Sequence, residues 1–265
     1  MTTDWLAVCR AAAQDVERVL AEMPSPEARS RVVGEGEGGD ETTAIDEAAE
    51  QAVVERFRST GEGLCIVSEE LGELELRGGG FHVVIDPIDG SLNAKRGIPF
   101  FSVSLAIADG ARMGDVFFGY VRDYGSGEEW WAERGGGAFL NGVPLDGPRP
   151  RKRIEILSFE ATRTDLVAEK AGAMVGIAHR LRIMGSLALS LCHLAAGRVD
   201  AVCSLKGARS VDIAAAQLLV RERGFAIDLF EDPPFEAAPL DVEARSRVVA
   251  GASPEVCERL AAALR

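Results

Sequence analysis

The feature that most constrains the fold is the segment 83–91, VVIDPIDGS, in which an apolar run ends in two acids three positions apart. An apolar run that lacks helical spacing predicts a buried strand over 82–86. Pro87 fixes its own φ and disfavours helical geometry at Asp86, so we expect the strand to stop there. The chain therefore delivers Asp86 and Asp89 together at the end of a buried element.

The same segment offers ligands for a divalent cation and for a phosphate. Asp86 and Asp89 repel each other when both are ionised, unless a cation lies between them. Hard oxygen ligands at this density, with a free carbonyl at Ile88, favour Mg²⁺ or Mn²⁺. Residues 90–93, GSLN, can begin a helix whose free backbone N–H groups bind phosphate. The alternative interpretation is an ordinary Asp-Gly turn after a strand.

Three further segments place acids at the ends of expected elements: 42–46 (TTAID), 64–70 (LCIVSEE) and 210–216 (SVDIAAA). Each has a purely structural alternative. Thr43 and Asp46 have the spacing of a capping box, and Asp212 suits the first turn of a helix. Glu69 and Glu70 can form a solvated turn. Together, however, the segments form an ordered set of acids at element ends.

This ordered set resembles the inositol monophosphatase family, within the wider lithium-sensitive, Mg²⁺-dependent sugar-phosphatase superfamily. The resemblance covers nearly the whole chain and rests on the segments 68–70 (SEE), 86–93 (DPIDGSLN), 137–142 (GAFLNG), 185–186 (GS) and 211–215 (VDIAA). It implies an α+β fold, the layered αβαβα architecture of inositol monophosphatases and fructose bisphosphatases. It also implies a Mg²⁺-dependent phosphomonoesterase that forms a homodimer.

Details of the motifs are more similar to the archaeal-type fructose-1,6-bisphosphatase/inositol-1-monophosphatase branch, which often hydrolyses both substrates. Ser91 stands where many bacterial and animal members have Thr, and Val211 where they have Trp. Leu205 stands where inositol-specific members carry a Glu that holds a sugar hydroxyl. We therefore expect a phosphatase of sugar or polyol phosphates (fructose 1,6-bisphosphate, inositol monophosphate or both) rather than an enzyme restricted to inositol.

The resemblance also implies which residues hold the metal. It assigns a first Mg²⁺ to Glu69, Asp86 and the Ile88 carbonyl, and a second to Asp86, Asp89 and Asp212. A third, weaker ion near Glu69 is expected to bind mostly water. The expected cofactor is thus two or three Mg²⁺ ions, with Mn²⁺ as an alternative.

Catalytic and substrate-binding residues follow from the same resemblance. Ser91 and Asp46 are expected to orient and deprotonate the attacking water, with Glu69 as the third catalytic residue. The amides of Gly90 and Ser91 are expected to bind the phosphate. The expected contacts on the sugar side are Asp89, Gly185, Ser186 and Arg209.

Arg209 has two open interpretations. It could hold the second phosphate of a bisphosphate as a two-pronged hydrogen-bond donor, or it could form an ordinary surface salt bridge. Lys206 is a weaker candidate for the same contact.

Composition and net charge restrict the expected partners and the expected location of the protein. A net charge of −13 argues against a surface for nucleic acid or for an anionic membrane, so a small-molecule phosphate is the expected partner. No apolar run is long enough to span a membrane. The start of the chain, MTTDW, lacks the regions of a signal peptide, and the five cysteines contain no Cys-x-x-Cys pair. We therefore expect a cytoplasmic protein with reduced core thiols.

The chain divides into two expected halves. Residues 1–142 are expected to form an α+β half with the metal site, and residues 143–265 an α/β half that completes the metal and sugar site. The segment 30–41, rich in Gly and Glu, predicts a mobile connector, and the resemblance implies that it is also a catalytic loop. The expected helices are 4–22, 44–59, 164–175, 186–197 and 211–223. The expected strands are 64–67, 82–86, 101–107 (half-buried), 114–124, 128–133, 154–159, 180–183, 199–204 and 225–229.

Two other functions stay open. The same metal site serves phosphatases of nucleotides such as 3′-phosphoadenosine 5′-phosphate or NADP, although a nucleotide would want an aromatic side chain for stacking near the sugar pocket. A non-catalytic relative that binds RNA or the transcription machinery is the other alternative, and the acidic net charge counts against RNA.

Overall fold

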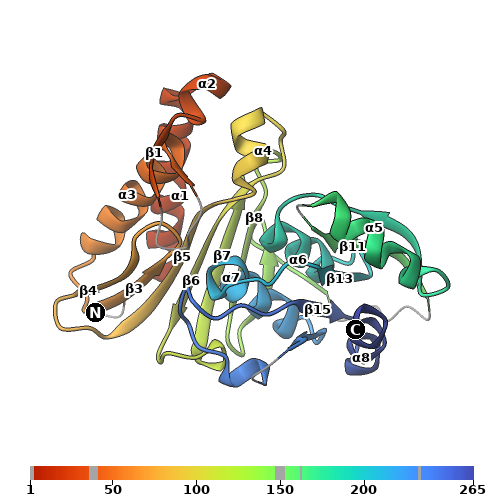
Figure 1. The fold of residues 1–265 in the computed structure, drawn as a ribbon. Coiled ribbons are helices and arrows are strands. Elements are labelled where there is room, and N and C mark those ends of the chain that lie inside the picture. The colour runs from red at the N-terminus through yellow and green to blue at the C-terminus, as the bar shows by residue number, and fades with distance from the viewer. Residues whose placement is uncertain (1–2, 36–40, 147–152, 162, 232–233) are drawn as a thin grey trace.

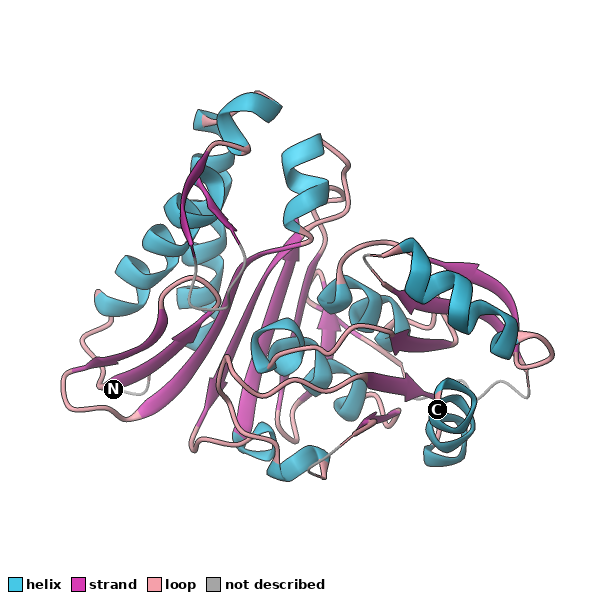
Figure 2. Cartoon of the chain, viewed as in Figure 1, coloured by secondary structure: helices cyan, strands magenta, loops and turns pink. Residues whose placement is uncertain are grey.

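Two β-sheets, separated by helices, organise the chain, as Figure 1 shows. The computed structural model describes residues 3–35, 41–146, 153–161, 163–231 and 234–265. Figure 2 shows that helices also cover the outer faces of both sheets. The expected mobile loop at 30–41 falls in part on 36–40, which lies outside the described residues. Its two flanks, β1 (Val32–Glu35) and β2 (Glu41–Thr43), pair as an antiparallel hairpin.

The first sheet has eight strands in the order β10-β9-β8-β7-β6-β5-β3-β4. All neighbours are antiparallel except β3 and β5. The strands are β3 (Leu64–Ser68), β4 (Gly72–Leu76), β5 (Phe81–Asp89), β6 (Ser102–Ala108), β7 (Val116–Asp123), β8 (Glu129–Glu133), β9 (Gly137–Leu140) and β10 (Val143–Pro144). The expectation of a half-buried β6 was wrong, because every residue of β6 is buried and helices cover both faces of the sheet there.

Strand β5 also runs further than expected. Instead of stopping at Asp86, it continues to Asp89 through a β-bulge: Asp86 pairs with Ser104, but Asp89 pairs with Ser102. One extra residue on β5 is accommodated between these pairs. A bulge tolerates Pro87 because the missing N–H is not needed for a regular ladder. The bulge therefore places Asp86 and Asp89 at the end of a central, buried strand.

The second sheet has five strands in the order β12-β11-β13-β15-β14. They are β11 (Ile154–Glu160), β12 (Ala178–Arg182), β13 (Ala201–Ser204), β14 (Ala226–Leu229) and β15 (Val248–Gly251). Strands β12, β11 and β13 are parallel, whereas β15 is antiparallel to both of its neighbours. The expected alternation of strands and helices is present, with β15 as an addition that the periodicity did not indicate.

Three pairs of helices complete the layers: α1 (Trp5–Glu22) with α3 (Ala44–Arg58), α6 (Leu187–Ala195) with α7 (Ser210–Glu222), and α5 (Thr164–Lys170) with α8 (Pro254–Leu264). The first pair packs on the outer face of the eight-stranded sheet, the second lies between the sheets, and the third covers the five-stranded sheet. This αβαβα order confirms the expected fold. The expected helix at 164–175 is shorter, because a 3₁₀ turn (Ala171–Met174) replaces its second half.

Small side chains let α7 approach the first sheet closely. The helix contains three consecutive alanines, Ala214 to Ala216, all buried. A Cβ atom on Gly119 of β7 would come within 2.4 Å of the Ala215 carbonyl oxygen. This contact sets the depth at which α7 lies between the sheets, and with it the position of the acids at its N-terminus.

The remaining elements are short. They are α2 (Pro26–Arg29), α4 (Ser91–Arg96), the 3₁₀ turn Met113–Asp115 and the 3₁₀ turn Phe235–Ala237. The five cysteines are all unpaired, and four of them are buried, as expected for reduced core thiols. No described helix is long and apolar enough to cross a membrane. The division at 142/143 stays a proposal; the two sheets are joined through 145–153, of which 147–152 lies outside the described residues.

Candidate metal and phosphate site

Ten of the eleven site residues expected from the sequence line one cleft of about 220 Å³. We call it the carboxylate cleft; these residues are Glu69, Asp86, Ile88, Asp89, Gly90, Ser91, Gly185, Ser186, Arg209 and Asp212. They come from both halves of the chain: from the turn after β3, from β5 and from the start of α4 in the first, and from the starts of α6 and α7 in the second. The exception is Asp46, which is not among the lining residues.

The bulge in β5 positions the two central acids. Asp86 is only 1% exposed, and its Oδ1 accepts a hydrogen bond from the Ile88 N–H at 3.1 Å. Asp89 faces the second half of the chain: its Oδ2 accepts hydrogen bonds from the Ser186 hydroxyl and from the Ala188 N–H. Asp89 therefore joins β5 to the first turn of α6 and closes one side of the carboxylate cleft.

Two glycines allow the chain segments to meet beside Asp89. Gly90 has φ +88° and precedes α4, and Gly185 has φ +85°. A Cβ on Gly90 would lie 3.1 Å from the Gly185 carbonyl oxygen, so both the backbone conformation and the space require glycine there. Asn93 Nδ2 completes the junction by donating to the Met184 carbonyl at 2.8 Å. The start of α4 is thus anchored, with Gly90 and Ser91 lining the cleft.

Glu69 follows the end of β3 in a turn that another acid shapes. Glu50 of α3 accepts hydrogen bonds from the Ser68 hydroxyl and from the N–H groups of Glu70 and Leu71. These contacts turn the backbone sharply after Ser68. The Glu69 side chain consequently points into the carboxylate cleft, where its partner is Arg209.

Arg209 lies between two of the acids. Its Nη2 donates to Glu69 Oε1 and lies 3.6 Å from Asp212 Oδ1. Its backbone N–H also donates to Asp212 Oδ2 at 2.6 Å, which caps the N-terminus of α7. Asp212 therefore caps the first turn of α7, as its structural interpretation expects, and its role as a metal ligand stays a prediction. The surface salt bridge considered for Arg209 is instead a buried one, because the residue is only 5% exposed.

The acids in the cleft lack enough positive charge. Burial, opposed by the charge of Arg209 and assisted by the nearby Asp212 carboxylate, raises the pKa of Glu69 to about 7. Burial likewise raises the pKa of Asp89 to about 7, and it raises the pKa of Asp86 well above its usual range. Carboxylates that share a site repel one another, so they cannot all ionise on their own. A bound cation removes this repulsion and allows them to ionise together.

These groups fit Mg²⁺ by their chemistry, because the donor set is entirely oxygen: the carboxylates of Glu69, Asp86, Asp89 and Asp212 and the Ile88 carbonyl. In the described part of the chain, however, no group of three or more His, Cys, Asp or Glu side chains is arranged closely enough to hold an ion. In this arrangement the guanidinium of Arg209 lies between Glu69 and Asp212.

Asp46 has a different environment from the other site residues. Its Oδ2 accepts hydrogen bonds from the Thr43 hydroxyl and N–H, so the capping box considered for this pair is confirmed. The same oxygen lies 3.0 Å from Lys95 Nζ on α4. The catalytic role of Asp46 stays a prediction, with its carboxylate held by Lys95 and outside the lining of the cleft.

Three residues that shape the site or its surroundings were not identified from the sequence: Glu50, Lys95 and Glu160. Glu160 at the end of β11 accepts hydrogen bonds from the N–H groups of Met184 and Gly185, and so holds the turn before α6. The signal for Glu160 was present, since it is another acid at the end of an apolar strand. Glu50 lies one helical turn after Asp46, on the same face of α3, which is a weaker signal.

Two expected substrate determinants lie in different places. Lys206 lines the carboxylate cleft, and its side chain is exposed. Leu205 is buried in the apolar cluster beneath α8 and does not line the cleft. Its side chain is therefore part of the core of the second half, while its neighbours Ser204 and Lys206 face the site.

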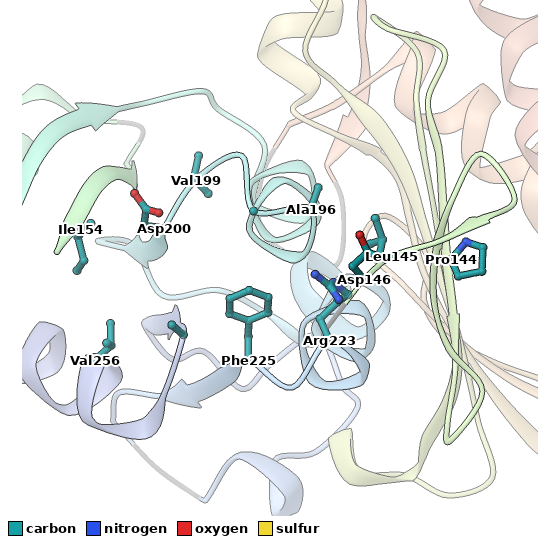
Figure 3. A pocket seen from close by; sticks show the side chains of 12 residues that line it. Pro144, Leu145, Asp146, Ile154, Ala196, Val199, Asp200, Arg223, Phe225 and Val256 are labelled. Carbon is teal, nitrogen blue, oxygen red and sulfur yellow. The ribbon is translucent and has the colours of Figure 1, made fainter. Parts of the chain in front are cut away.

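A second cavity, of about 270 Å³, lies away from the acids at the junction of the two sheets (Figure 3). Its lining is mixed: apolar side chains such as Leu145, Ile154 and Phe225 lie beside the charged Asp146, Asp200 and Arg223. None of the site residues expected from the sequence lines this cavity. The expected chemistry is thus concentrated in the carboxylate cleft.

Comparison with known proteins agrees with this geometry. The sequence pattern of the inositol monophosphatase family matches residues 2–265. The chain is 33% identical to the fructose-1,6-bisphosphatase/inositol-1-monophosphatase of Methanothermobacter thermautotrophicus, over 97% of this chain and 95% of that protein. It is also 34% identical to the Nus factor SuhB of Escherichia coli K12, over 72% of each protein.

Solved structures show the same fold. An inositol monophosphatase–fructose 1,6-bisphosphatase superimposes with a TM-score of 0.85 at 27% identity, covering 98% of this chain and all of the other. An inositol monophosphatase from Thermotoga maritima gives a TM-score of 0.79 at 27% identity, covering 99% of this chain and 98% of the other.

Proposed function

The chain belongs to the inositol monophosphatase family, and on that premise we propose that it is a Mg²⁺-dependent phosphomonoesterase of sugar or polyol phosphates, fructose 1,6-bisphosphate, inositol monophosphate or both. The observation that carries the proposal is the carboxylate cleft, in which Glu69, Asp86, Asp89 and Asp212 meet beside the start of α4. Elevated pKa values for three of these acids support a site built to receive cations.

Glu69, Asp86, the Ile88 carbonyl, Asp89 and Asp212 would hold two or three ions, in the sets expected from the sequence. When bound, Mg²⁺ supplies Lewis-acid activation of the phosphate and of the attacking water. The Gly90 and Ser91 amides, at the start of α4, donate to the phosphate oxygens. The Ser91 hydroxyl orients the water, and Asp46 takes its proton; Lys95 holds the Asp46 carboxylate in place for that step.

On the substrate side, the cleft favours a sugar phosphate over a nucleotide. Asp89, Gly185 and Ser186 offer polar groups to hydroxyls, and Arg209 and Lys206 are the lining cations available to a second phosphate. No aromatic side chain is found among the described residues that line the cleft. A nucleotide base would therefore lack a stacking surface, which makes 3′-phosphoadenosine 5′-phosphate and NADP the less favoured substrates.

The non-catalytic alternative rests on one observation, the similarity to Nus factor SuhB proteins. Under that alternative the chain binds RNA or the transcription machinery. We favour the phosphatase because every residue implied as a metal ligand is present in the cleft. We also propose that the protein is cytoplasmic and forms a homodimer. Sedimentation of the purified protein would test the homodimer, because it measures the mass of the assembly.

Phosphate release in the presence of Mg²⁺ tests the main proposal. The substrates are fructose 1,6-bisphosphate, inositol 1-phosphate, 3′-phosphoadenosine 5′-phosphate and NADP, with excess chelator as the control. Comparable release from the first two, lost on chelation, supports the dual sugar-phosphatase. A sole preference for either nucleotide overturns the substrate class. No release from any of the four, together with a gel shift of ribosomal leader RNA, would establish the binding alternative.

A further inference from the structure

Arg209 is the only buried cation among the described residues of the carboxylate cleft. It is 5% exposed, whereas Lys206, the other lining cation, is exposed. Its Nη2 contacts Glu69 and lies 3.6 Å from Asp212. In the assignment proposed above, Glu69 belongs to one ion and Asp212 to the other. The guanidinium therefore touches a ligand of each expected metal position at once.

The hydrogen bonding of Arg209 is incomplete. Its Nε and Nη1 atoms are buried, and neither has a hydrogen-bond partner among the described residues. A guanidinium carries five N–H donors, and burying some of them without acceptors is costly. Arg209 is thus held in the cleft by the charge of the acids rather than by a satisfied network. Such a side chain is free to move when that charge is neutralised by something else.

We propose that Arg209 is an exchangeable internal cation, which neutralises Glu69 and Asp212 in the metal-free cleft and leaves Glu69 when a divalent ion binds. This inference rests on the proposed metal site. It explains how four acids, two of them buried and two partly buried, can share one cleft in the absence of metal. The same displacement turns a guanidinium with unused donors toward the cleft, where an anionic substrate group can accept from it.

Competition between Arg209 and the ion is measurable without any turnover. We would titrate Mg²⁺ into the metal-free protein at pH 8 by calorimetry and record thermal melting with and without Mg²⁺. The variant Arg209→Gln should bind Mg²⁺ about tenfold more tightly than the wild type. It should also melt at a lower temperature when metal-free, and saturating Mg²⁺ should close most of that difference. Lys206→Gln removes the same charge without a buried contact, and should change Mg²⁺ affinity less than twofold.

Arg209→Lys keeps the positive charge but replaces the guanidinium, and it is the variant to measure if Arg209→Gln does not fold. It should bind Mg²⁺ with an affinity between those of the wild type and Arg209→Gln. Equal or weaker Mg²⁺ binding by the variants overturns the proposal, and weaker binding would make Arg209 a residue that positions the metal ligands. A wild-type protein that binds no Mg²⁺ overturns both the proposed function and this inference. A wild-type protein that binds Mg²⁺ and releases phosphate, with variants of unchanged affinity, overturns only the role of Arg209.

Discussion

Lys95 Nζ lies 3.0 Å from Asp46 Oδ2, which ties the last turn of α4 to the first turn of α3. Asp46 is 4% exposed, and the Lys95 side chain is 17% exposed, so water screens the pair only weakly. Helix α4 begins at Ser91, and Asp46 is the residue proposed to act with Ser91 on the attacking water. The ion pair therefore connects the two parts of the proposed catalytic group through one short helix.

Replacing Lys95 by Met should lower kcat about tenfold with little change in KM, because the Asp46 carboxylate loses the partner that holds it. Removing one member of a fully buried ion pair costs roughly 3–5 kcal/mol, and the partial exposure of Lys95 should reduce this to about 2 kcal/mol. Lys95→Arg should recover part of the rate. Steady-state kinetics and thermal melts check both effects, with Arg96→Met, on the exposed side of α4, as the control. A loss of stability at full kcat would reduce the pair to a structural contact.

Asp89→Asn should nearly abolish turnover, by about 1000-fold or more, while leaving the fold intact. The amide oxygen of Asn can still accept from the Ser186 hydroxyl and the Ala188 N–H, so the junction with α6 is preserved. The lost group is the charge that a cation requires. Phosphate release at saturating Mg²⁺ and the melting temperature measure the two properties separately. Wild-type activity in this variant would show that the metal assignment is wrong.

Ser91→Ala should lower kcat about 100-fold, within the range for the loss of a group that assists proton transfer, without abolishing Mg²⁺ binding. The reason is that Ser91 contributes a hydroxyl beside the acids and is not one of the expected metal ligands. Calorimetric titration with Mg²⁺ is the matched measurement. If the variant lost every Mg²⁺ site, Ser91 would have to be reassigned as a ligand.

Mg²⁺ affinity should fall as the pH is lowered from 8 to 6. Burial raises the pKa of Glu69 and of Asp89 to about 7, so both carboxyls take up protons in this range, and the ion must displace those protons to bind. Calorimetry at pH 6.5 in two buffers of different ionisation enthalpy should detect proton release, and the part of this release that comes from Glu69 and Asp89 should be lost by about pH 8.5. An affinity that is constant between pH 6 and 8 would contradict these pKa values.

The same two groups should make the metal-free protein less stable as the pH rises. Unfolded Glu and Asp have pKa values of about 4, so between about pH 4 and 7 the folded state retains protons that the unfolded state has lost. Their contribution to stability is complete below about pH 4 and is lost as the pH rises through about 7. Melting temperatures from pH 6 to 8 should therefore fall without metal, and saturating Mg²⁺ should remove most of that fall. Asp89→Asn is the control, since it should flatten the slope of the metal-free protein.

Much of the site was predictable because its elements carry local signals. The apolar run before Asp86, the proline after it and the acid near the start of α7 each specify a local conformation over a few residues. Carboxylates at the ends of buried elements indicate metal chemistry without any knowledge of the packing. The prediction that the strand ends at Asp86 was wrong, because a β-bulge can accommodate a proline inside a paired strand. The residue that pairs with Asp86 is Ser104, 18 residues away in sequence, so no local pattern indicates the bulge.

The sequence by itself thus determined the identity of the acids and their place at the ends of elements, because periodicity and backbone preferences act over short distances. It indicated the layered fold only through its resemblance to the inositol monophosphatase family. Only the tertiary structure decided what those acids contact. Arg209 and Glu69 are 140 residues apart in the chain, and Lys95 and Asp46 belong to different helices. Such pairs depend on how α7 packs against the first sheet and on where α4 meets α3. Side-chain burial and charge neutralisation are properties of that packing, so no local pattern specifies which cation meets which acid.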